Sequence, residues 1–134
     1  MFDHEQLKVY QSSLDFIDNI TTILEQVPKR LAAHDQLDRA STSIPLNIAE
    51  GNGKFTSKDR CRYYDNARGS SLECAASLDV LVRRRILEPG VVEAPKALLV
   101  EIVSMLVGLI RSQPGNRVFE EGVGYGGEGE RETE

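Results

Sequence analysis

The sequence predicts an all-α protein: an antiparallel, up-down-up-down four-helix bundle followed by a disordered acidic tail. Apolar residues recur at helical spacing in four segments, which proline and glycine separate. No segment shows the sustained alternation of apolar and polar residues that is typical of a strand. The chain has 134 residues, which fits a single domain. We place the bundle at residues 1–113 and the tail at residues 114–134.

The first predicted helix covers roughly the first 27 residues and ends at Pro28. It carries two apolar stripes, although a surface helix normally has one. One stripe follows a heptad pattern and comprises Leu7, Tyr10, Leu14, Ile17, Thr21 and Leu24. The other comprises Val9, Phe16, Ile20, Ile23 and Val27. One stripe can face the core of the bundle, so the second needs another partner.

The second predicted helix begins near Leu31, and Pro45 inside it predicts a kink or a break. The glycines of Gly51-Asn52-Gly53 stop it. The third helix opens at Thr56, where a hydroxyl followed three residues later by a carboxylate forms a variant of the capping box. Three consecutive arginines close this helix near residue 85.

The fourth predicted helix starts between Val91 and Pro95 and is apolar almost all round from Ala97 to Ile110. This run is shorter than the ~20 residues of a membrane span, so we expect a buried helix and no membrane. Leaving five or six such side chains exposed would cost on the order of 8–15 kcal/mol. We therefore expect self-association. The predicted interface residues are Phe16, Ile23, Leu99 and Val103.

Charge and cysteine content limit the classes of function that we expect for this protein. The net charge is −5, and the tail, with two Arg and six Glu, contributes −4 of it, which leaves the body at −1. We expect a cytoplasmic protein with reduced thiols, since no signal peptide precedes the first helix. No catalytic, cofactor-binding or metal-binding spacing is present, so we expect a protein that is not an enzyme.

A basic segment at residues 54–68 is the candidate nucleic-acid contact. Its net charge is +3, and aromatic residues are interleaved with the cations, a composition that suits phosphate contact and base stacking. The cations fan around the helix, however, which favours an ordinary solvated surface, although a ring could gather several weak patches. The candidate residues are Lys54, Lys58, Arg60, Arg62 and Arg68.

Polar residues at helical spacing form a second candidate site on the second helix, namely Arg39, Ser43, Asn47 and Glu50. One interpretation is a ligand or RNA site. The favoured alternative is a polar network between the second and third helices. Such a network could also satisfy the carbonyl of Ser41, which Pro45 leaves without its helical partner.

Two stretches resemble a known bacterial family. One is residues 35–51, which end in Ser43-Ile44-Pro45-Leu46-Asn47-Ile48-Ala49-Glu50-Gly51, and the other is residues 67–74. They resemble the four-helix-bundle proteins encoded in intervening sequences of 23S rRNA genes, and the resemblance spans roughly Leu7 to Ser112. It implies a bundle that assembles into a ring, typically a homopentamer.

The accessory protein of diversity-generating retroelements resembles this architecture and binds nucleic acid beside its reverse transcriptase. The present sequence departs from the family pattern at Asp38, where a basic residue is usual. The leading hypothesis is therefore a non-enzymatic, self-assembling scaffold or accessory subunit whose partner is itself. The alternative is an RNA- or DNA-binding accessory protein that uses the basic segment in an oligomeric ring.

Overall fold

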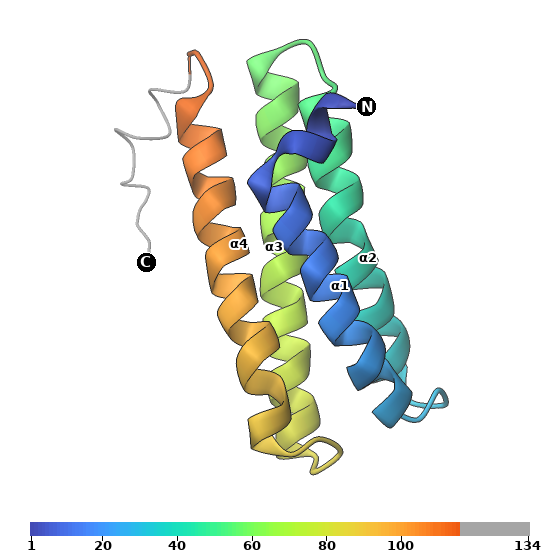
Figure 1. The fold of residues 1–134 in the computed structure, drawn as a ribbon. Helices are drawn as coiled ribbons and strands as arrows, with labels where there is room; N and C mark the ends of the chain where they lie inside the picture. Colours follow the sequence, from blue (N-terminus) through green and yellow to red (C-terminus); the bar gives the residue numbers. More distant parts are fainter. Residues whose placement is uncertain (116–134) are drawn as a thin grey trace.

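The computed structural model describes residues 1–115, most of which lie in four antiparallel helices joined by short turns (Figure 1). The helices are α1 (Lys8–Gln26), α2 (Ala32–Asn52), α3 (Ser57–Arg83) and α4 (Glu93–Ser112). Short 3₁₀ turns, η1 (Asp3–Gln6) and η2 (Pro89–Val92), precede α1 and α4. The predicted all-α four-helix fold is confirmed. The expectation of a disordered tail falls on residues outside the described ones, apart from Pro114 and Gly115.

The helices pack in chain order around the bundle. The contact between α2 and α3 is the most extensive, those between α3 and α4 and between α1 and α2 are smaller, and that between α1 and α4 is the smallest. The pair α1 and α2 therefore forms one edge of the bundle, and the pair α3 and α4 forms the opposite edge.

Each helix buries one apolar stripe, as 3.6 residues per turn require of an amphipathic helix. α1 buries the stripe that contains Phe16. The heptad stripe lies beside it: Leu14 is exposed, whereas Tyr10 and Leu24 are partly buried against the core. The residues at the centre of the core are Phe16, Ile20, Leu37, Ile44, Ile48, Leu78, Leu81, Ile102 and Leu106.

The structure corrects three of the four predicted interface residues. Phe16, Ile23 and Leu99 are buried inside the single chain, among the residues of the core. They cannot reach another subunit without opening the bundle. Val103 lies partly exposed on α4, so its role at an interface stays a prediction.

Pro45 does not break α2, which runs without interruption from Ala32 to Asn52. Pro45 is itself buried. Packing of the helix against its neighbours outweighs the single backbone hydrogen bond that proline removes. The predicted cap at Thr56 is present, because its hydroxyl accepts a hydrogen bond from the amide of Asp59 at 3.1 Å.

Candidate functional site

Ser43 and Asn47 form a polar network that crosses from α2 to α3. The Ser43 hydroxyl lies 2.9 Å from the hydroxyl of Ser70 on α3. The Asn47 side-chain amide donates to the carbonyl and the hydroxyl oxygens of Ser43, at 2.9 and 2.8 Å. These contacts are partly buried and satisfy one another, so they fix the register of two helices without needing a ligand.

The other two residues of the predicted network lie apart from it. Glu50 forms an ion pair with Lys54 at 3.8 Å, one turn further along the chain. Arg39 is exposed and has no hydrogen bond or ion pair within residues 1–115. All four residues nevertheless line one open groove of about 420 Å³ along α2.

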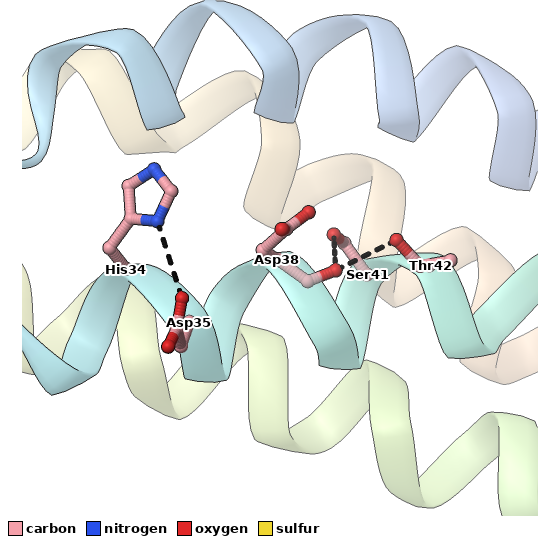
Figure 2. A network of polar contacts seen from close by, with 5 residues as sticks. All are labelled: His34, Asp35, Asp38, Ser41 and Thr42. Atoms are coloured by element: carbon pink, nitrogen blue, oxygen red, sulfur yellow. Dashed lines mark hydrogen bonds and ion pairs between the residues drawn. The ribbon is translucent and has the colours of Figure 1, made fainter. Parts of the chain in front are cut away.

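Figure 2 shows the hydrogen bonds of two hydroxyl groups that precede Pro45, those of Ser41 and Thr42. Ser41 and Thr42 both donate to the carbonyl oxygen of Asp38, at 2.9 and 2.8 Å. The expectation that a side chain satisfies the carbonyl of Ser41 is therefore not met by these two residues. The carboxylate of Asp38 is exposed, and it makes no hydrogen bond or ion pair with any described residue.

Ion pairs with nearby carboxylates neutralise much of the positive charge of the basic segment at residues 54–68. Arg62 pairs with Asp59 at 3.6 Å, and Arg68 pairs with Asp65 at 2.9 Å. Lys54 is held by Glu50, as described above. These short-range pairs on exposed side chains reduce the field that a phosphate backbone would meet.

The two remaining cations of the segment, Arg60 and Lys58, differ in whether another residue of the chain binds them. Arg60 donates to the carbonyl of Lys54 at 2.8 Å and approaches Gln113 at the end of α4 at 3.5 Å. Lys58 is exposed, and no described residue pairs with it. Phe55, three residues earlier in the chain, is 96% exposed in the turn between α2 and α3. One free cation and one free aromatic ring therefore remain of the predicted patch.

Burial changes the acidity of both cysteine thiols of the bundle. Burial raises the pKa of the Cys74 thiol to about 12, so this thiol stays protonated and unreactive in the folded chain. Burial also raises the pKa of Cys61, whose sulfur lies 3.7 Å from the carbonyl of Ile110. His34 Nδ1 is 3.9 Å from Asp35, beyond hydrogen-bond distance (Figure 2). Within residues 1–115, no cluster of potential ligands could hold a metal ion.

The heptad stripe of α1 forms one partly exposed apolar surface, in which Tyr10 and Leu24 also pack against the core. The opposite flank of α1, which includes Asn19, lines a groove against Val91 in η2, just before α4 begins. At 100° per residue the heptad stripe therefore points to the side of α2. Leu14 in this stripe is 42% exposed, and Leu46 on α2 is 62% exposed. The α1/α2 face is defined by Tyr10, Leu14, Ile17, Leu24 and Leu46.

A second exposed apolar surface lies on α3 and α4. The ion pair between Asp79 and Lys96 marks the flanks at which these helices meet. On that side, Val100 is 67% exposed, and Leu72 and Val80 are about half exposed. The α3/α4 face is defined by Leu72, Val80, Val100, Val103 and Val107. The helix order places this face on the edge of the bundle opposite the α1/α2 face.

Sequence reasoning found part of these two surfaces. It identified the heptad stripe of α1 and Val103, but it missed Leu46, Leu72, Val80 and Val100. The last of these lies in the apolar run of the fourth helix, where periodicity alone does not separate buried positions from exposed ones. The exposed positions on α3 lie among polar residues and carry no signal in the sequence.

The comparisons with known proteins bear on this geometry. The sequence profile of the 23S rRNA-intervening sequence protein family matches residues 5–108, which is more than half of the chain. The chain belongs to this family. The match includes the Ser43–Asn47 network, the basic segment and all the residues that define the two apolar faces.

A solved structure shares the fold of this member of the 23S rRNA-intervening sequence protein family. It is a crystal structure of a protein with unknown function from the S23 ribosomal protein family of Bacteroides thetaiotaomicron. The TM-score is 0.72 at 23% identity, and the match covers 78% of this chain and 99% of that one. No curated protein matches the chain. Among the described helices, none combines the length and apolarity that crossing a membrane requires.

Proposed function

We propose that this member of the 23S rRNA-intervening sequence protein family is a non-enzymatic, self-assembling protein. It acts as a scaffold or accessory subunit and has copies of itself as partners. The observation that carries the proposal is the pair of exposed apolar faces on opposite edges of the bundle. Fully burying a large aliphatic side chain is worth roughly 1.5–3 kcal/mol, so several partly exposed ones on each face favour association.

The placement of the two faces on one chain favours a closed ring. Two different faces give a head-to-tail contact, which makes a ring if the rotation between neighbours closes. The number five comes from the resemblance described above, and we propose a homopentamer on that basis. We place the assembly in the cytoplasm, where the two free thiols, Cys61 and Cys74, would stay reduced.

Light scattering coupled to gel filtration tests the proposal. At micromolar concentration we expect a mass of about 75 kDa, five times the 14.9 kDa of one chain. Val100→Glu adds a charge to the α3/α4 face and should reduce this mass. Phe55→Glu is the matched control, because Phe55 is exposed but lies on neither face. A wild-type mass near that of one chain would refute self-assembly.

A second candidate function is nucleic-acid binding, which Phe55 specifically favours. An exposed aromatic ring three residues before the free cation Lys58 can stack on a base while the ammonium contacts a phosphate. A gel-shift assay with structured RNA at low salt tests this role. Binding that falls steeply with added salt, and that Phe55→Ala with Lys58→Ala abolishes, would support it. Equal binding by wild type and the double variant would exclude this site.

A further inference from the structure

An apolar groove lies between the start of α1 and the end of α4. Its volume is about 350 Å³, which falls within the ~300–1,000 Å³ range of ligand pockets. The contact between α1 and α4 is the smallest between neighbouring helices, so the groove lies where the bundle packs least. This α1/α4 groove is lined by Leu7, Lys8, Val9, Met105, Gly108, Leu109 and Ser112.

The groove is open because of Gly108 and apolar because of its neighbours. Gly108 is exposed, and no atom lies within 4 Å of the place that an added Cβ would occupy. Leu7, Met105 and Leu109 are partly buried against the core. A glycine inside a helix destabilises that helix relative to alanine. At this position it leaves α4 without a side chain, so another stretch of backbone can approach the helix closely.

The chain turns as α4 ends beside the groove. Ser112 is the last residue of α4 and lines the groove. Gly115, which follows Pro114, has a positive φ of 83°. Proline followed by a residue with positive φ is the geometry of a type II turn, which reverses the direction of the chain. Gln113 approaches Arg60 of α3 at 3.5 Å, so the α3 side of this end is covered while the groove on the α1 side stays open.

The sequence just after this turn is suited to the groove. Residues 116–121 read Asn-Arg-Val-Phe-Glu-Glu, in which Val118 and Phe119 form an adjacent apolar pair. An extended chain covers at most ~3.3–3.6 Å per residue, so Val118 lies within about 11 Å of Gly115. The stretch of α4 from Met105 to Ser112 is about 10 Å long. The apolar pair can therefore reach the groove, and the short tether gives it a high effective concentration there.

The charge match at the groove is local and secondary to the apolar contact. Lys8 is the one charged residue in the lining; it is exposed and forms no ion pair within residues 1–115. Residues 116–121 carry Arg117, Glu120 and Glu121, a net charge of −1. The other charged side chains of η1, α1 and α4 closest in sequence to the groove have both signs and lie outside its lining, namely Asp3, Glu5, Asp15, Glu101 and Arg111.

We propose that Val118 and Phe119 bind in the α1/α4 groove of their own chain, with Glu120 and Glu121 beside Lys8. Residues 116–121 then form a strap that joins the start of α1 to the end of α4 and covers an apolar surface that is otherwise open. The apolar pair supplies the attraction, and the carboxylates fix its direction along the groove. The strap acts within one chain, so it is independent of the self-assembly proposed above.

Tryptophan fluorescence tests the strap, because the chain has no tryptophan of its own. Phe119→Trp places a single reporter in the apolar pair, and Tyr125→Trp, six residues further along, is the matched control. We expect Phe119→Trp to emit at the shorter wavelength, with an acrylamide quenching constant at least about twofold lower, since the groove removes the ring from water. Equal emission and equal quenching in the two variants would overturn the strap.

A variant of the groove locates the contact. Adding Gly108→Glu to the Phe119→Trp chain fills the groove and repels the carboxylates, so its quenching should rise to that of the control. Gly69→Glu on α3 is the matched substitution, because Gly69 is also exposed and has open space around it, and it should change nothing. Circular dichroism checks that each variant is helical, and Lys8→Glu replaces Gly108→Glu if that variant does not fold. A reporter that stays shielded despite the blocked groove would overturn this site.

Mixing two chains separates binding within one chain from binding to a second copy. One chain carries Phe119→Trp with Gly108→Glu, and the other ends at Gly115 and keeps its groove open. After the two are refolded together from urea, the reporter should remain as accessible to acrylamide as in the first chain alone. Shielding that appears in the mixture would overturn binding within one chain. Neither result depends on the mass of the assembly, so failure of the strap leaves the proposed function untouched.

Discussion

Replacing Gly51 by alanine puts a methyl group where α2 packs tightly against α3. A Cβ atom at this position would lie 2.9 Å from Cβ of Tyr63 and 3.1 Å from the ring of Tyr64. Cβ of Tyr63 is fixed to its backbone and cannot rotate away. The two helices, which form the most extensive contact in the bundle, must therefore move apart.

The sign of the effect depends on two opposing terms. Alanine favours a helix over glycine by up to about 1 kcal/mol, and less near a helix end such as this one. Overpacking a tight contact costs about 1–3 kcal/mol. We therefore expect Gly51→Ala to lower the free energy of unfolding by about 1–2 kcal/mol.

The chain offers matched controls for the same substitution. Gly69 in α3 and Gly108 in α4 have no neighbouring atom within 4 Å of the place that an added Cβ would occupy, so only the helix-propensity term acts there. Gly69→Ala and Gly108→Ala should each raise the free energy of unfolding by about 0.5–1 kcal/mol. Urea unfolding followed by circular dichroism, at one protein concentration, measures all three. A Gly51→Ala variant as stable as the controls would refute the close approach of α2 and α3.

Three further predictions concern single side chains. The pKa of Cys74 rises from 9.0 to about 12 on folding, so its contribution to stability is complete below pH 9 and is lost as the pH rises toward 12. Urea midpoints should fall over that range, and less steeply in Cys74→Ala. Arg85 has a positive φ of 62°, so Arg85→Gly should stabilise the chain by about 1 kcal/mol, whereas Arg83→Gly at the last residue of α3 should destabilise it by a smaller amount. A double-mutant cycle of Ser43→Ala and Ser70→Ala should give a coupling of about 0.5–1 kcal/mol, and zero coupling would contradict their hydrogen bond.

Local signals in the sequence predicted most of the fold and some of the pairing at the candidate site. Proline and glycine marked the connections, and the hydroxyl of Thr56 marked the start of α3. The ion pairs of Lys54, Arg62 and Arg68 join residues three or four apart. The carboxylate partners of these cations could therefore have been predicted from their spacing in the sequence. Such a prediction would have shown that the basic segment keeps little unpaired positive charge.

Local signals of this kind could not predict contacts between segments that are distant in the sequence. The hydrogen bond between Ser43 and Ser70 joins residues 27 apart, and nothing in the sequence pairs these two serines. Local signals also failed at Pro45, because the local effect of a proline inside a helix predicts a kink or break. The helix stays continuous because its packing against neighbours decides the outcome.

The sequence by itself determined that four amphipathic helices form, because helical periodicity and end signals act within a few residues. It also determined that α1 has two apolar stripes. Only the tertiary structure decided that the stripe with Phe16 and Ile23 enters the core while the stripe with Leu14 stays at the surface. In an isolated helix, two stripes of similar hydrophobicity are equivalent to each other. The positions of the other three helices make them different, because burial is a property of the whole packed bundle.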